Sequence, residues 1–255
     1  MDGLTTVDLA PGGYAEAVPS HQDQAHQALA RWAGFPVRRE PRPIVFTSMS
    51  AAQLDQLAED ARFRAMFDGP AVAESELPAE LIPAATAYCR DVHTGASGSL
   101  APVIRGPGPF ATDRGVRDLP AWMMYPANRR WPFIAVDPEF ERQMTWRPHG
   151  LVPSGGEESS LAGDGRTLTY RFIGTPKVYA AYPHAEVYET DTAVFVQPME
   201  VPLDGGDGVR LAYMERREVV VRLAAPLGNR VLISRGHGPG ADTFGAPLTV
   251  LPSGS

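Results

Sequence analysis

TLTYRFIGTPKVYAAYPHAEVYETDTAVFVQPMEV, residues 167–201, consists of short runs of β-branched and aromatic residues separated by turn residues. Such runs favour strands, and Gly, Pro and Asp between them favour turns. Thr190-Asp191-Thr192 is expected to form a hairpin turn that exposes its acid to water. Regular spacing of this kind predicts antiparallel hairpins in a sandwich or barrel.

Similar runs continue on both sides of this stretch. They are AWMMY and WPFIAV before it, and VRLAYM, EVVVRLAA and RVLIS after it. Further upstream, RPIVFTS at 42–48 also predicts a strand. The linker-like composition of 151–165 marks a boundary between two parts. We therefore predict an α+β fold, predominantly antiparallel β in its C-terminal part, with a few short helices in its N-terminal part.

Three helices are expected before residue 100. Ser20 caps the first, in which Ala25, Ala28, Leu29 and Trp32 share one face and Gly34 follows the end. A capping box of Ser50 and Gln53 starts the second, which continues to residues 68–70, and the third spans roughly 79–91 with Pro83 inside it. The expected division is an arm with one short helix (1–40), an α/β-containing segment (41–157) and an antiparallel β domain (158–255) that can form one unit with 41–157.

Composition excludes several classes of function. The net charge is −7 and basic residues cluster only in pairs, so the concentrated basic face of a nucleic-acid-binding protein is not expected. No apolar run approaches the roughly 18–20 residues of a membrane span, and the first thirty residues lack the basic start and apolar stretch of a signal peptide. Cys89 is the only cysteine, which suits a reducing, cytoplasmic location and favours a core role over a nucleophilic one.

The segment ATDRGVRDLPAWMMYP, 111–126, has two interpretations. In the structural one, Asp113-Arg114-Gly115 forms a tight turn, Pro120 keeps the preceding residue extended, and Trp122 enters a core. In the functional one, an Asp-Arg pair beside aromatic side chains orients a polar ligand. We favour the structural interpretation.

The chain also resembles a known group of proteins. ATDRGVRDLPAW, followed by DGRTLTYRFIG, VYETDTAVFV and VVVRLAAPLGNRVLI, is similar to a widespread group of actinobacterial proteins of unknown function, several of them exported. The similarity spans roughly residues 41–250 and its motifs look structural, so it implies no activity. Relatives often hold two cysteines in the C-terminal half, where this chain has none. That difference agrees with a cytoplasmic member recruited to specialised metabolism.

Known catalytic motifs are absent from the sequence. It contains no GxGxxG after a strand, no GxxxxGK[ST], no GxSxG and no HExxH. We therefore expect no cofactor and no metal. Acid–base chemistry is the more natural enzymatic interpretation, because the strand period in residues 213–223 places Glu215 and Arg217 on one face and Arg216, Glu218 and Arg222 on the other. If that face lines a cavity, the candidate catalytic residues are Glu189, Arg216, Arg217 and the tyrosines Tyr182 and Tyr188; the alternative is a solvated face.

Large apolar side chains are concentrated between residues 122 and 146. Methionine and aromatic residues adapt to irregular apolar ligands, so this stretch is a candidate pocket with His149 as a catalytic residue at its mouth. The candidate substrate-binding residues are Trp122, Met124, Tyr125, Trp131, Phe133 and Trp146. The alternative is a junction core between the two halves.

These features predict a protein that binds a bulky, largely apolar small molecule. Its catalytic form would be a cofactor-independent cyclase, isomerase or lyase of actinobacterial specialised metabolism that holds a reactive conformer. The alternative is a non-catalytic ligand-binding or protein-interaction module. Neither nucleic acid nor a membrane is an expected partner, and the sequence does not indicate an oligomeric state.

Overall fold

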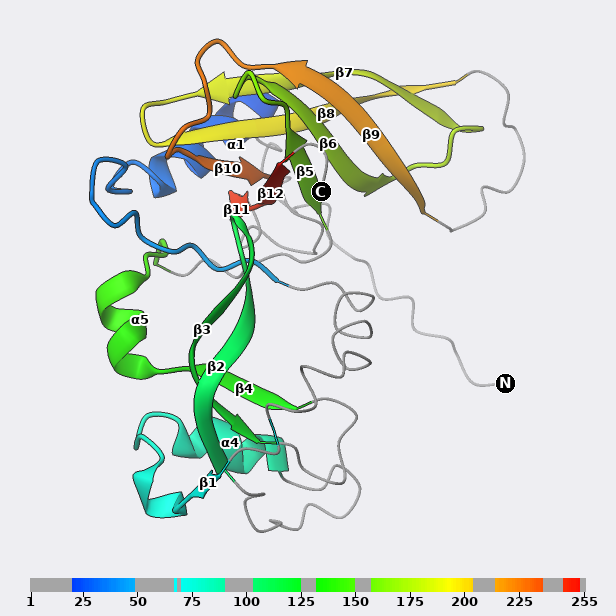
Figure 1. Cartoon of the computed structure of the whole chain (residues 1–255). Coiled ribbons are helices and arrows are strands. Elements are labelled where there is room, and N and C mark those ends of the chain that lie inside the picture. The colour runs from blue at the N-terminus through cyan, green and yellow to red at the C-terminus, as the bar shows by residue number, and fades with distance from the viewer. Residues whose placement is uncertain are drawn as a thin grey trace, which may run out of the picture.

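The computed structural model describes residues 20–48, 67, 70–89, 103–124, 132–149, 157–203, 214–235 and 245–252. These residues form two parts (Figure 1). The upper body contains two four-stranded sheets and helix α1 (His21–Arg31). The lower lobe is built on a long hairpin that extends away from the upper body.

The lower lobe is an antiparallel sheet with strand order β1-β2-β3-β4. Its strands are β1 (Ala71–Val72), β2 (Val103–Thr112), β3 (Gly115–Met124) and β4 (Phe133–Val136). The 3-10 helix η2 (Glu74–Glu76), α4 (Ile82–Cys89) and α5 (Pro138–Met144) accompany this sheet. Asp137 caps α5, because its side chain accepts from the backbone N–H groups of Glu139 and Phe140.

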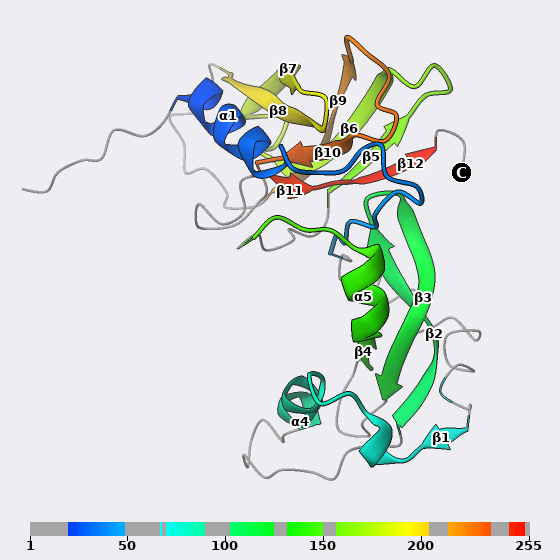
Figure 2. The ribbon, with the colours of Figure 1, turned by 90° about the vertical axis from the view of Figure 1, so that its left-hand side faces the viewer.

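Two sheets of the upper body pack face to face. One has the order β12-β5-β6-β9, with β5 (Glu158–Leu161), β6 (Thr167–Gly174), β9 (Glu215–Arg222) and β12 (Thr249–Pro252). The other has the order β11-β10-β8-β7, with β7 (Ala180–Glu189), β8 (Ala193–Pro202), β10 (Val231–Ser234) and β11 (Ala246–Pro247). Figure 2 shows α1 on the outer side of this second sheet.

Strand β8 is buried on both faces, which explains its unbroken apolar start. Val194 and Val196 belong to the core shared by the two sheets, whereas Ala193 and Phe195 pack against α1. Successive side chains of a strand point to opposite faces, so the two sets serve two different cores. The buried face of α1 is the predicted one, since Ala25, Ala28 and Leu29 are all buried.

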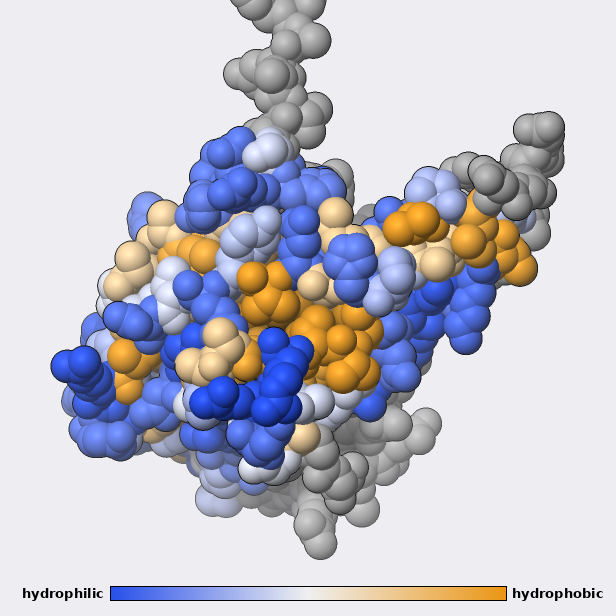
Figure 3. Space-filling model, turned by 90° about the horizontal axis from the view of Figure 1, so that it is seen from above, coloured by the Kyte–Doolittle hydropathy of each residue, from blue (hydrophilic) through white to orange (hydrophobic). Residues whose placement is uncertain are grey.

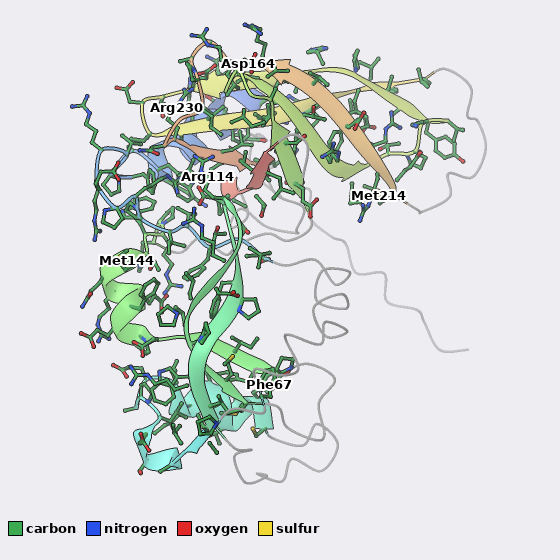
Figure 4. The ribbon with its side chains drawn as sticks, viewed as in Figure 1. Phe67, Arg114, Met144, Asp164, Met214 and Arg230 are labelled. Carbon is green, nitrogen blue, oxygen red and sulfur yellow. The ribbon has the colours of Figure 1, made fainter. Side chains whose placement is uncertain are left out.

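The hairpin β2–β3 joins the lower lobe to the upper body through a buried ion pair. Gly115 has a φ of 91° and closes the predicted tight turn. Asp113 is 1% exposed and accepts two hydrogen bonds from Arg42, at 3.2 and 2.5 Å. Arg114 donates to the carbonyl oxygens of Gly228 and Arg230 in the upper body. Figure 4 shows Arg114 at the end of the hairpin that meets the upper body.

The predicted fold class, α+β with predominantly antiparallel β structure, is confirmed. Two pairs are parallel, β8 with β10 and β5 with β12, and sequence did not indicate them. The expected strand at 42–48 is wrong, because Ile44 and Phe46 form only isolated bridges, to Thr145 and Thr112. The expected linker at 151–165 contains β5. The predicted helix after Ser50 lies outside the described residues, apart from Phe67.

The remaining helices differ from the expected ones in two respects. The predicted helix at 79–91 is the shorter α4, with Pro83 in its first turn, where a missing N–H is harmless. Helix α5 was not predicted. Within the described ranges, no helix is both long and apolar enough to cross a membrane.

Candidate functional site

A pocket of about 440 Å³ opens in the upper body, and we call it the β6–β8 pocket. Its lining comes from both sheets and from the start of α1, and comprises His21, Glu157, Tyr170, Phe172, Ile173, Gly174, Thr175, Tyr182, Val196, Gln197, Pro198, Met199, Glu200, Met214 and Arg235. Its volume lies within the roughly 300–1,000 Å³ usual for small-molecule sites. It is the candidate functional site.

The wall of the pocket contains a row of three aromatic rings. The ring centroids of Tyr170 and Phe172 are 5.3 Å apart, and Phe172 meets Tyr182 edge to face at 4.9 Å. Gly174 allows this approach, because an added Cβ would lie 2.8 Å from Tyr182 Oη and 2.9 Å from the Phe172 ring. Val196 and Met199 of β8 also line the pocket. The wall therefore suits an apolar or aromatic ligand.

Hydrophobic side chains also reach the surface of the upper body. Seen from above, they occupy the centre of the face and one extended end, with hydrophilic groups around them (Figure 3). Figure 4 places Met214 at that extended end. The exposed large hydrophobic residues of the strand ends there are Val178, Val201, Leu203 and Met214. Met214 also lines the pocket, so apolar surface continues from the pocket to the outside.

A polar group lies at the Tyr182 side of the pocket. Tyr182 Oη donates to Glu200 Oε2 at 2.7 Å and accepts from the backbone N–H of Thr175 at 3.0 Å. Partial burial and the hydrogen bond to Glu200 raise the pKa of Tyr182. The Arg217 guanidinium lies over the Tyr182 ring at 5.0 Å and donates to the Thr175 carbonyl oxygen. These contacts hold the Tyr182 ring in position.

A second polar group is more deeply buried. Glu157 is 7% exposed and accepts a hydrogen bond of 2.6 Å from Ser234 Oγ. Tyr170, which also lines the pocket, is 1% exposed. Burial, followed by the charge of Glu157, raises the pKa of Tyr170 well above its usual value. Tyr170 is therefore a neutral phenol at physiological pH.

Gln197 adds a buried amide to the same lining. It is 6% exposed, and its Oε1 has no hydrogen-bond partner among the residues that the structure describes. Buried side-chain oxygens in native proteins are nearly always paired. This oxygen is therefore an acceptor that a ligand donor could pair.

Of the predicted catalytic residues, Tyr182 lines the pocket and Arg217 lies beside it, over the Tyr182 ring. Glu189 instead pairs with Arg230 at 2.7 Å and accepts from the Ala224 N–H at 2.6 Å. Partial burial alone would raise the pKa of Glu189, but these hydrogen bonds lower it. The structure thus gives Glu189 a role in holding the 224–230 turn against β7.

The other predicted catalytic residues are not part of the pocket lining. Tyr188 packs against the α1 core, 6.1 Å from the His26 ring, and donates to Glu186 Oε2 at 2.9 Å. Arg216 and His149 are exposed. The structure therefore does not bring the predicted catalytic set together.

The predicted substrate-binding residues are divided between two cores. Trp122 and Met124 are buried in the core of the lower lobe, with Phe133 packed against it. Trp122 Nε1 donates to Asp137 Oδ2 at 3.1 Å. Trp146 packs instead on Trp32 and Phe35 in the α1 core, with centroids at 5.1 and 5.3 Å. Tyr125 and Trp131 lie outside the described residues. The described members thus occupy no common pocket.

Sequence reasoning missed most of the pocket's polar residues. Glu157 lies in the segment read as a linker, and Ser234 ends a strand that looks purely apolar. Of these residues, only Gln197 had a recognisable sequence signal, because a single amide follows the apolar run Ala193–Val196. Tyr170 looked like an ordinary strand aromatic.

Metal binding has no support within the described part of the chain, where no three His, Cys, Asp or Glu side chains are grouped to hold an ion. Cys89 is buried, and its Sγ lies 3.6 Å from Met124 Sδ. This contact is consistent with the expected core role of the thiol.

Comparison with known proteins found no matching family model, no matching curated protein and no matching solved structure. The chemistry of the β6–β8 pocket is therefore the basis for a functional assignment.

Proposed function

We propose that this protein binds a bulky, largely apolar small molecule in the β6–β8 pocket. The observation that supports the proposal is the aromatic row Tyr170–Phe172–Tyr182 along a cavity of about 440 Å³. Small-molecule sites are typically apolar cavities with a few polar groups that orient the ligand. The two polar groups around Glu157 and Glu200 match that pattern.

The catalytic form of this proposal is a cofactor-independent isomerase or cyclase. Glu157 favours it, because a carboxylate beside a bound apolar molecule is able to accept a proton. Tyr170 adds a neutral phenol whose pKa is raised by burial and by the charge of that carboxylate. The alternative is a binding protein without turnover. Recovery of a chemically unchanged ligand after prolonged incubation with the protein would favour the alternative.

Binding can be tested with N-phenyl-1-naphthylamine, an uncharged probe whose fluorescence increases in apolar sites. Met199→Trp places a large ring into the pocket lining. Val201→Trp is the matched control, because Val201 lies two residues further along β8, on the same face, and is 44% exposed outside the lining. We expect saturable binding to the wild type and to Val201→Trp, and affinity at least about tenfold weaker in Met199→Trp, because the ring occupies ligand volume.

Two results would contradict the proposal. The first is no saturable increase in fluorescence with folded wild-type protein. The second is unchanged affinity in Met199→Trp, which would place the probe elsewhere, for example on the exposed apolar end near Met214.

A further inference from the structure

We infer that the ligand carries an uncharged hydrogen-bond donor, a hydroxyl or an N–H group, that binds Gln197 Oε1. This inference rests on the proposed function and specifies the chemical class of the ligand. It predicts an apolar molecule with one neutral donor at the position facing β8.

The first support is the position of Gln197 in an otherwise apolar strand. Residues Ala193–Val196 are all fully buried and fill two cores, and Gln197 continues this buried run. An apolar residue there would need no partner. An amide oxygen that leaves water without gaining a donor destabilises the folded protein.

The second support is the chemical nature of the missing partner. Gln197 lines the pocket, is more than nine-tenths buried, and its Oε1 lacks a donor among the described residues. A carbonyl oxygen accepts and cannot donate. The missing group is therefore a donor, and Gln197 is one of the residues through which the pocket could supply it.

The cost of desolvation favours a neutral donor over a cation. The lining contains one cationic side chain, Arg235, and two carboxylates, Glu157 and Glu200. The two carboxylates of the lining already accept hydroxyl hydrogen bonds, Glu157 from Ser234 and Glu200 from Tyr182. Moving a cation from water to the aromatic wall would add a desolvation cost that a hydroxyl avoids.

The test compares two probes of nearly the same shape, 2-naphthol and 2-methoxynaphthalene. The naphthol has an O–H donor, and the methyl ether has none. Binding is measured by equilibrium dialysis, with the free probe quantified by its absorbance. We expect 2-naphthol to bind the wild type at least about tenfold more tightly, because the ether leaves the buried oxygen unpaired.

Two variants assign the preference to Gln197. Gln197→Met keeps the side-chain length and removes the acceptor, so the two probes should bind with nearly equal affinity. Gln24→Met is the matched control, because Gln24 is a buried glutamine on α1 that lies outside the pocket lining. It should retain the wild-type preference for 2-naphthol.

The outcomes separate this inference from the proposed function. Equal affinities in the wild type, or a naphthol preference that survives Gln197→Met, would overturn the inference while binding of N-phenyl-1-naphthylamine still supports the pocket. If neither that probe nor either naphthalene binds, the proposed function fails and the inference fails with it.

Discussion

Removal of the Asp113 carboxylate is expected to destabilise the junction between the lower lobe and the upper body. The Asp113 side chain is 2% exposed, and the side chains of Arg42 and Arg114 are 14% and 19% exposed. Arg42 contacts both carboxylate oxygens, and Arg114 Nε lies 3.8 Å from Oδ2. Asp113→Ala leaves two largely buried guanidinium groups without their counterion.

The expected loss of free energy of unfolding follows from the burial of these three side chains. Breaking a buried ion pair by removing one partner costs about 3–5 kcal/mol, because the remaining charge stays desolvated. Burial already lowers the pKa of Arg114, and the charge of Asp113 opposes that shift. We therefore expect Asp113→Ala to lower the free energy of unfolding by about 3–5 kcal/mol. Exposed pairs, by comparison, contribute about 0–1 kcal/mol.

Urea denaturation followed by tryptophan fluorescence measures this change. Asp118→Ala is the control, because Asp118 is an exposed acid on the same hairpin and should change the free energy of unfolding by no more than about 0.5 kcal/mol. A double-mutant cycle with Arg42→Ala should show a coupling of about 0.5–3 kcal/mol. A loss below about 1 kcal/mol in Asp113→Ala, or no coupling to Arg42, would refute the argument that a desolvated ion pair holds the junction.

Two further predictions concern turns. Gly115→Ala should destabilise the protein by about 1–2 kcal/mol, because φ at this position is +91°. Gly163→Ala should have little effect, because nothing lies within 4 Å of its added Cβ. Equal melting temperatures for the two variants would contradict this prediction. Hydrogen bonds from the N–H groups of Thr167 and Arg166 lower the pKa of Asp164 to about 2 from the ordinary 3.8. A carboxyl whose pKa is lower in the folded state stabilises the fold above its unfolded pKa, and this contribution is lost as pH falls through the folded value. The melting temperature of the wild type should therefore fall more steeply than that of Asp164→Asn between about pH 4 and pH 2, and parallel curves would disprove the assignment.

Local features of the fold could be predicted from sequence. The cap at Ser20, the buried face of α1, and the turns at Gly115 and Thr190 all depend on residues within a few positions of each other. Capping, helical periodicity and turn geometry are short-range effects, so composition and spacing are sufficient to indicate them.

The division of the Trp and Met residues needed the three-dimensional structure. Trp122 and Met124 share one face of β3, and Met123 lies in a different core on the other face. Trp146 follows α5, a helix that sequence did not predict, and packs against Trp32 over a hundred residues earlier. Composition showed that these side chains were numerous, but it could not show which cores they fill.

The sequence by itself indicated strands β6 to β10, the turns and the predominantly antiparallel β character of the fold, because strand and turn preferences are local. Tertiary structure alone decided that β10 lies parallel beside β8 and that β12 lies parallel beside β5, since such pairings join distant segments. The candidate site depends on those pairings, because its polar groups at Glu157, Tyr170, Gln197 and Ser234 come from four separate segments. Each looks ordinary within its own segment. Strand pairing and sheet packing are what bring a carboxylate, a neutral phenol and a buried amide to the lining of one pocket.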